Sequence, residues 1–328
     1  MKPNLPKISV IVPSYNQAAY IGETLDSLWA QDYPLLEVIV VDGGSTDGSV
    51  DIIRAHELRL AHWVSEKDSG QSEAINKGFR KATGEVVTWL NSDDCYEPGT
   101  LQAVGLLFAG DPQLGLVHGK SLLFGEGRKQ TVIGLDHDIP LHGYFPYMRF
   151  PQPSSFFRRS VLAPLLPVSE TLHYAMDFEL VVKLLLSGGV IRRMPGVLSR
   201  YRLHPQSKSN HQLAFLKEWS RVVAGFFQSV EGGEVYLDRM RNAGLQVPSD
   251  LPLYVSALNF TSVELEDVFW QHLHLCYHTC YQALDREACR RISYYIKVHD
   301  HQRYVENNYA AYDRRLKFIP KFVFNWLR

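Results

Sequence analysis

Ile8-Ser-Val-Ile-Val-Pro-Ser-Tyr-Asn16 begins as a short apolar, β-branched run and ends in polar residues, as a buried strand does where it enters a turn. Downstream, two more apolar runs, Leu36-Glu-Val-Ile-Val-Val41 and Glu85-Val-Val-Thr-Trp-Leu90, and a shorter one at 61–65 predict further strands. Residues 18–30 and 71–82 between them have helical spacing. This alternation predicts an α/β fold with a parallel sheet and helices on both of its faces.

The second half of the chain has a different pattern. Residues 136–155 are rich in His, Pro and aromatic residues without periodicity, and helical patterns dominate beyond about 210. We therefore expect two regions, an α/β domain over 1–208 and a helical C-terminal extension over 209–328.

Composition narrows the class of protein. The 328 residues carry a formal charge of −1, which does not suit a nucleic-acid partner that needs many cationic phosphate contacts. Four cysteines make no disulfide framework in a chain of this length, so a reducing compartment is expected. No apolar run is long enough to span a bilayer, and the start has no signal-peptide core. These features predict a cytoplasmic protein.

Polar side chains follow all four predicted strands of the first half. In an open parallel sheet, ligands bind outside these carboxyl ends. Three of the four segments contain carboxylates, which repel each other unless a cation lies among them, and oxygen ligands of this kind favour Mg²⁺ or Mn²⁺ shared with substrate phosphates. The segments are Pro13–Asn16, Asp42–Gly48, Glu66–Gln71 and Asn91–Asp94.

Two common nucleotide motifs are absent. Gly43 and Gly48 have the glycine spacing of a phosphate-binding loop, but Ser49 stands where that loop needs a lysine. No Gly-x-Gly-x-x-Gly follows the first strand, which argues against a dinucleotide cofactor.

As a set, the motifs resemble the family 2 glycosyltransferases. They are Pro13-Ser-Tyr-Asn16, Val41-Asp-Gly-Gly-Ser-Thr-Asp47, Gly70-Gln-Ser-Glu-Ala-Ile-Asn-Lys-Gly78 and Asn91-Ser-Asp-Asp94, followed by weaker matches at Pro151–Arg159, Met176–Glu179 and Arg200–Ser209. The resemblance implies a GT-A fold with a mostly parallel sheet, a nucleoside-diphosphate sugar donor, a divalent metal and inversion at the anomeric carbon.

The resemblance also assigns roles to residues of this chain. Asp94 would be the metal ligand, and Asp93 would contact the ribose or the sugar of the donor. The nucleotide pocket falls on Pro13, Ser14, Tyr15, Asp42 and Asp68. Many members have two adjacent acids after the second strand, one of which contacts the base. Gly43 stands at the second position here, so the base contact and the donor identity stay open.

An inverting transfer needs a general base that takes the proton of the acceptor hydroxyl. The resemblance places this role on Asp177, with Glu179 as the second choice, although both carboxylates could instead stabilise the N-terminus of a helix. Arg202 and His204 lie in a cationic loop whose composition is typical of groups that hold a leaving diphosphate, and an ordinary basic surface loop is the alternative.

We therefore expect an inverting, metal-dependent glycosyltransferase that acts on a polysaccharide or a lipid-linked oligosaccharide. A non-catalytic protein that binds nucleotide sugars on the same fold is the alternative, and a nucleotidyltransferase is disfavoured because no Gly-rich basic loop follows the first strand. The basic and aromatic segment 313–328 predicts peripheral attachment to the inner, anionic face of a membrane, or else a tail packed on the domain. His272, Cys276 and Cys280 favour a packing helix over a zinc site.

Overall fold

The computed structural model describes residues 4–318 and divides the chain into two compact units. The first unit comprises Met1–Asp138 and Met148–Ser207, and the second comprises Ile139–Tyr147 and Lys208–Arg328. The chain therefore passes between the units three times, because a short segment of the second unit is inserted into the sequence of the first.

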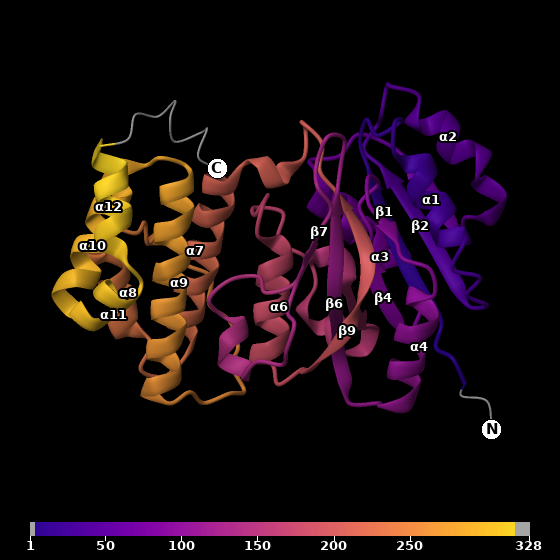
Figure 1. Ribbon diagram of the computed structural model, residues 1–328. Coiled ribbons are helices and arrows are strands. Elements are labelled where there is room, and N and C mark those ends of the chain that lie inside the picture. The colour runs from indigo at the N-terminus through magenta and orange to yellow at the C-terminus, as the bar shows by residue number, and fades with distance from the viewer. Residues whose placement is uncertain (1–3, 319–328) are drawn as a thin grey trace. The chain divides into compact units, whose positions relative to one another are not determined.

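A single sheet forms the centre of the first unit, and its nine strands, counted over residues 4–318, run in the order β3-β2-β1-β4-β8-β6-β9-β5, with β7 paired to β6 (Figure 1). The strands are β1 (Ile8–Ser14), β2 (Leu36–Asp42), β3 (His62–Ser65), β4 (Val86–Trp89), β5 (Cys95–Tyr96), β6 (Leu114–Phe124), β7 (Thr131–Ile133), β8 (Ser155–Arg158) and β9 (Val190–Arg202).

The strands predicted from the first half of the sequence form the parallel part of the sheet. β1 pairs in parallel with both β2 and β4, and β2 pairs in parallel with β3. The α-helices of this unit are α1 (Ile21–Trp29), α2 (Ser49–Ala55), α3 (Gln71–Lys81), α4 (Thr100–Gly110), α5 (Arg159–Leu162) and α6 (Met176–Leu186). α3 packs closely on β1, because a Cβ on Gly78 would lie only 2.3 Å from Cγ2 of Ile11.

The other half of the sheet is mixed. β8 pairs antiparallel with β4 and β6, β5 pairs antiparallel with β9, and β6 and β9 run parallel. The predicted α/β class is confirmed, while the parallel pairing is concentrated in β1–β4. Trp89 lies in the core, as its sequence context suggests: it is 1% exposed and stacks on Phe157 with a centroid distance of 6.0 Å.

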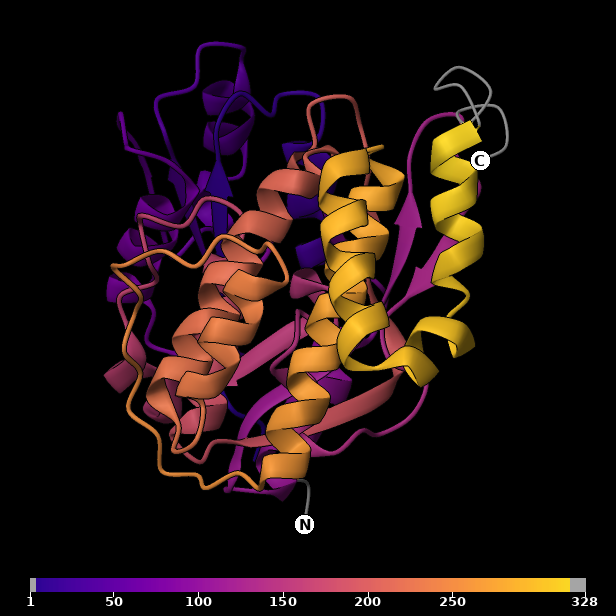
Figure 2. The same cartoon turned by 90° about the vertical axis from the view of Figure 1, so that its left-hand side faces the viewer.

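The second unit is helical, as predicted for the C-terminal region. Its helices are α7 (Gln212–Ser229), α8 (Glu234–Asn242), α9 (Ser262–Gln282), α10 (Arg286–His299), α11 (His301–Glu306) and α12 (Tyr309–Phe318), seen together in Figure 2. Among residues 4–318, no helix is both long and apolar enough to cross a membrane. The tail predicted to bind membranes falls mostly outside the described residues, which end at 318.

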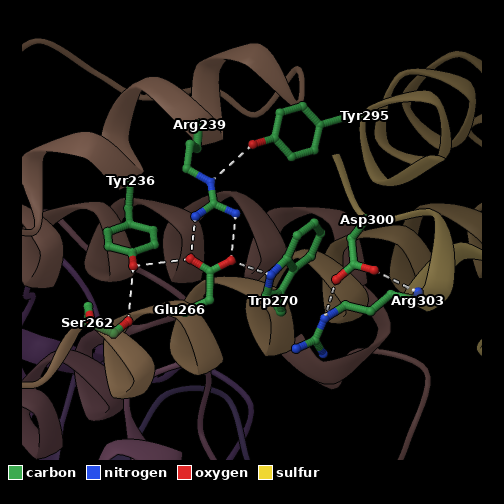
Figure 3. A network of polar contacts seen from close by, with 8 residues as sticks. All are labelled: Tyr236, Arg239, Ser262, Glu266, Trp270, Tyr295, Asp300 and Arg303. Carbon is green, nitrogen blue, oxygen red and sulfur yellow. Dashed lines mark hydrogen bonds and ion pairs between the residues drawn. The ribbon is translucent and has the colours of Figure 1, made fainter. Parts of the chain in front are cut away.

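A polar network joins α8, α9 and α10 (Figure 3). The Arg239 guanidinium donates two hydrogen bonds to the Glu266 carboxylate, which also accepts bonds from Trp270 Nε1 and Tyr236 Oη. Arg239 Nε donates to Tyr295 Oη on α10 at 3.2 Å. The Arg239 guanidinium also lies 4.2 Å from the centroid of a neighbouring aromatic ring. The contacts of the Arg239–Glu266 ion pair thus hold the three helices together.

The inserted segment 139–147 belongs to this helical unit. His272 Nδ1 donates to the Pro146 carbonyl at 2.8 Å, and the ring of Phe145 stacks on that of Phe226 with a centroid distance of 4.5 Å. His272 and Cys276 are buried in the packing face of α9, and residues 4–318 contain no cluster of three potential metal-binding side chains. This burial confirms the prediction that α9 is a packing helix.

We expect the protein to lose stability as the pH falls from about 6.5 towards 4. Burial lowers the pKa of His272 to about 4, whereas an unfolded histidine titrates near 6.5. The unfolded chain therefore binds more protons in this window, so unfolding becomes easier as the pH falls, by about 2 kcal/mol for this ring between pH 7.5 and 5.0.

Denaturant unfolding of the wild type and of His272→Asn at the two pH values measures this effect. The variant should be less stable at pH 7.5 but should lose less stability on acidification. His137→Asn, at an exposed position, is the matched control and should keep the wild-type difference. An unchanged difference in His272→Asn would contradict the assignment.

Candidate active site

The carboxyl ends of the four parallel strands meet at one edge of the sheet. Ser14 at the end of β1 pairs with Asp42 at the end of β2, which in turn pairs with Ser65 at the end of β3. The segments after these strands therefore lie side by side, as the sequence predicts. Ser14 is buried, as is the Pro13 ring, whereas the Tyr15 side chain is 62% exposed and free to meet a ligand at this edge.

Asp42 shapes the turn after β2. Its Oδ2 accepts hydrogen bonds from the backbone N–H groups of Gly44 and Ser45 and from Ser65 Oγ, at 2.7–3.1 Å. Oδ1 accepts a further bond from Ser45 Oγ. The residue is fully buried, so both of its carboxylate oxygens are engaged by donors of the chain itself.

Side-chain hydrogen bonds also join the loop after β1 to the loop after β2. Asn16 N donates to Ser45 Oγ at 2.7 Å, and Asn16 Oδ1 accepts from Thr46 N at 2.9 Å. Ala18 N donates to Asp47 Oδ2 at 2.9 Å. These polar residues of the recognised motifs thus hold the loops in a defined geometry, a role that the motif alone did not assign.

The Asp68 carboxylate lies against Gly43. A Cβ built on Gly43 would lie 3.0 Å from each of the Asp68 carboxylate oxygens, so any side chain at position 43 would displace this group. Burial is the main cause that raises the pKa of Asp68, while the N–H of Gly70 donates to Oδ1 at 3.0 Å and favours the charged form. Asp68 therefore places its carboxylate directly beside Gly43.

The acidic pair after β4 is held by residues from the end of β9. Asp94 is fully buried, and its Oδ1 accepts a hydrogen bond from the backbone N–H of Arg202 at 2.9 Å. Burial, reinforced by the adjacent Asp93, raises the pKa of Asp94 well above its usual range. The nearby Arg202 guanidinium offsets this effect only in part, and a bound cation would further favour the charged form of both carboxyl groups.

Arg202 and His204 both contact this pair. Arg202 Nε donates to the Asp93 carbonyl at 2.9 Å, and its guanidinium also pairs with Glu23 on α1. His204 Nε2 lies 3.0 Å from Asp93 Oδ2, and its ring lies 4.8 Å from that of Tyr20 between centroids. The structure therefore brings His204, Arg202, Asp93 and Asp94 together, across more than 100 residues of sequence.

A chain of two hydrogen bonds also connects Asp94 to the start of α3. Asn91 Nδ2 donates to Asp94 Oδ2 at 3.2 Å, and Gln71 Nε2 donates to Asn91 Oδ1 at 2.7 Å. Neither Gln71 nor Glu23 stood out as a site residue in the sequence. Gln71 does lie in the strand-end segment Glu66–Gln71 and inside the Gly70–Gly78 motif, which are the two signals that could have identified it.

Asp177 and Glu179 occupy different environments at the start of α6. Asp177 is half-buried, and its Oδ1 accepts from the backbone N–H of Phe178 at 2.7 Å. Glu179 is buried and pairs with Lys183 Nζ at 2.7 Å, one helical turn further on. The catalytic role of Asp177 stays a prediction from the resemblance.

The donor set at this edge fits a metal ion shared with a substrate. Residues 4–318 contain no group of three His, Cys, Asp or Glu side chains placed to hold an ion by themselves. Mg²⁺ and Mn²⁺ commonly bind through one or two carboxylates and complete their coordination with diphosphate oxygens and water. The buried Asp94, with its raised pKa beside Asp93, matches that arrangement.

The curled α/β sheet flanked by helices has the GT-A fold. Residues 9–163 match the model of glycosyl transferase family 2, which confirms the resemblance found in the sequence. Residues 9–163 thus belong to glycosyl transferase family 2, and the chain is a glycosyltransferase with a GT-A fold.

Relatives and solved structures agree with this assignment. An uncharacterized glycosyltransferase of Nostoc sp. is 29% identical over 219 residues, which are 63% of this chain and 67% of that protein. S. aureus TarS 1–349 has a TM-score of 0.61 and 19% identity, covering 95% of this chain and 91% of that chain. The mannosyltransferase PcManGT from Pyrobaculum calidifontis, solved with GDP-Man and Mn2+, has a TM-score of 0.60 and 20% identity over 99% of this chain and 84% of that chain.

One relative is named for a biosynthetic role. A Bacillus subtilis glycosyltransferase, TuaG, is 40% identical over 100 residues, which are 30% of this chain and 40% of that protein. Its name provisionally assigns it to teichuronic acid biosynthesis.

Proposed function

We propose that the protein is an inverting, metal-dependent glycosyltransferase that moves a sugar from a nucleoside-diphosphate sugar to a hydroxyl of a polysaccharide or a lipid-linked oligosaccharide. The observation that carries the proposal is the buried Asp94 beside Asp93, braced by Arg202 and His204 at the carboxyl ends of the strands. The name of the Bacillus subtilis relative supports a polysaccharide acceptor.

The contacts of the residues at this edge of the sheet indicate a different role for each of them. Asp94 would hold the divalent ion, which when bound neutralises the diphosphate and stabilises it as a leaving group. Asp93, oriented by His204, would accept hydrogen bonds from the ribose or the sugar of the donor. Arg202 keeps the acidic turn in place through its backbone N–H and its Nε, so its contribution to donor binding is largely one of positioning.

Proton removal from the acceptor falls to Asp177. It lies at the N-terminus of α6, where its carboxylate is partly accessible, while the Glu179 carboxylate is neutralised by Lys183. Protonation of Glu179 would break its ion pair with Lys183, which makes Glu179 the poorer candidate for the base.

The nucleotide would lie between Tyr15 and Asp68. The exposed Tyr15 ring offers a stacking surface, and Asp68 offers carboxylate oxygens to ring N–H donors of a base. Pro13, Ser14 and Asp42 would form the floor of this site, with Asp42 acting through the turn that it stabilises.

A screen of donor hydrolysis over UDP-, GDP- and dTDP-sugars, with Mg²⁺ and with Mn²⁺, tests the proposal. Hydrolysis or transfer from one nucleotide class, dependent on the ion, is the expected result. Tight binding of a nucleotide sugar without turnover of any donor or acceptor would instead favour the non-catalytic alternative.

Asp68→Ala should lower the affinity for the preferred nucleotide about 10- to 100-fold. The change removes hydrogen bonds from a base to a charged acceptor, each of which contributes about 1.5–3 kcal/mol. Calorimetric titration with the nucleoside diphosphate in the presence of Mn²⁺ measures the change.

Glu66→Ala is the matched control for this experiment. Glu66 lies two residues before Asp68, but its carboxylate is half-exposed and pairs with Lys77 Nζ at 2.8 Å. We expect nearly unchanged affinity in that variant. Equal affinities of Asp68→Ala and the wild type would remove Asp68 from the nucleotide site.

The protein is further proposed to work on the cytoplasmic side of a membrane, attached at its surface, as a lipid-linked acceptor would require. The support for this comes from the charge pattern of the C-terminal residues, where cations alternate with aromatic side chains.

A further inference from the structure

Helix α10 in the second unit has one exposed face that the proposed transfer reaction does not use. Its buried side packs into the helical unit through Cys289, Ile292, Ser293, Tyr295 and Ile296. The opposite side, here called the basic face, comprises Arg286, Arg290, Arg291, Tyr294, Lys297 and Val298, all exposed. Their spacing of three, four and seven residues places them on one stripe of the helix.

The basic face combines cations with exposed apolar surface. Tyr294 is 69% exposed and Val298 is 58% exposed, and the two are one helical turn apart. Glu287 is the one acid on this side of α10, and it lies 3.5 Å from Arg291, so the face keeps an excess of positive charge.

The charge of this region differs from that of the chain as a whole. Residues 286–317 contain eight Lys and Arg residues and four Asp and Glu residues, a formal charge of +4, in a chain whose total is −1. Two of the four acids are engaged inside the unit: Asp300 with Arg303 on α11, and Asp313 with Tyr277 Oη at 2.7 Å. The Asp300–Arg303 pair is neutral as a unit, and the net charge of +4 already includes all four acids.

Hydrogen bonds at the start and on the buried side of α10 hold the basic face in a fixed position within the helical unit. Asp285 caps the start of α10 by accepting a hydrogen bond from Ala288 N at 3.0 Å. On the buried side, Tyr295 Oη receives the bond from Arg239, which the Glu266 carboxylate fixes in turn (Figure 3). A preorganised face loses little conformational entropy when it meets a flat partner.

We propose that the basic face of α10 docks on a membrane surface that contains anionic lipids. Arginine and lysine side chains there meet lipid phosphates, while Tyr294 and Val298 enter the boundary between headgroups and acyl chains. Anionic lipids attract such cations, and the attraction decays within a Debye length. The inference extends the proposed membrane partner to described residues, and it stands independently of the transfer reaction and of the tail beyond residue 318.

Co-sedimentation of the full chain with vesicles tests this docking surface. The wild type should pellet with vesicles of phosphatidylcholine mixed with phosphatidylglycerol, and not with phosphatidylcholine alone. Arg290→Glu with Lys297→Glu should weaken binding to the mixed vesicles at least about tenfold, because each cation near an anionic surface contributes to the attraction. Tyr294→Ser should weaken it without a change in charge.

The matched control is Arg80→Glu with Lys81→Glu, which reverses the same pair of residue types at exposed positions of α3 in the first unit. It should pellet as the wild type does. Lys321→Glu with Arg328→Glu measures the share of the C-terminal tail. Far-UV circular dichroism and thermal melting show that each variant is folded, and donor hydrolysis should stay unchanged in all of them, which separates this test from that of the proposed function.

Three results would each overturn the proposal: wild-type protein that fails to pellet with anionic vesicles, equal pelleting of the α10 double variant, or loss of binding in the tail variant alone. Retention on immobilised RNA that the α10 double variant abolishes, without any vesicle binding, would assign the face to a nucleic acid instead.

Discussion

Asp177→Asn should reduce transfer about 10²- to 10⁴-fold while the protein keeps its fold and its affinity for the donor. The amide is nearly isosteric with the carboxylate and can still accept the hydrogen bond from Phe178 N, so the start of α6 should be unchanged. What is lost is the ability to remove the proton from the acceptor hydroxyl. Turnover with acceptor and the donor Kd, measured on the same preparation, separate these quantities.

Glu179→Gln is the internal comparison, because Glu179 lies two residues further along α6. Its carboxylate is buried against Lys183, so the substitution leaves a cation without its partner and should lower the melting temperature more than the turnover. Near-normal turnover in Asp177→Asn together with a large loss in Glu179→Gln would reverse the assignment. Full activity in both variants would place the base outside α6.

Asp94→Asn should have the second large effect, and it should act on donor binding. We expect the affinity for UDP or GDP in Mn²⁺ to fall by about 100-fold or more, because the substitution removes the carboxylate that would hold the ion against the diphosphate. Calorimetric titration of wild type and variant, each with Mn²⁺ and with EDTA, gives the four affinities needed.

The stability of the Asp94→Asn variant separates binding from folding. Both Asp94 oxygens accept hydrogen bonds, from Arg202 N and Asn91 Nδ2, and the amide keeps only one acceptor, so thermal melting without metal should show a modest loss of stability. Asp26→Asn, at an exposed position on α1, controls for the loss of one formal charge. Equal nucleotide affinity of the wild type with Mn²⁺ and with EDTA would contradict the assignment of Asp94 as a metal ligand.

The sequence predicted the parallel part of the sheet well and the mixed part poorly. β1, β2 and β4 are buried apolar runs flanked by turns, a local pattern that needs no tertiary information. By contrast, β8 takes its place between β4 and β6 through pairings with residues tens of positions away, and the two-residue strand β5 exists because it pairs with β9. Neither arrangement leaves a local signal.

The same limit applies to the candidate site. The four strand ends, Asn91–Asp94 among them, can be grouped because parallel strands share one edge, whereas the roles of Asp93 and Asp94 follow from the family resemblance. His204 was grouped with phosphate binding on the strength of its cationic neighbours, whereas the structure pairs it with Asp93 at 3.0 Å. The position of the Asp68 carboxylate beside Gly43 depends on a close approach between two loops, for which the sequence has no local signal.

The insertion of segment 139–147 into the helical unit restricts how this protein could be recombined with its relatives. A chimera made by one crossover near residue 208 would combine a foreign helical unit with a native Pro146 carbonyl and Phe145 ring, which would lose His272 and Phe226 as partners. A functional exchange needs both segments to be transferred together. The helical unit therefore cannot be exchanged by itself. It includes residues 139–147, which lie in the sequence between the two segments of the first unit.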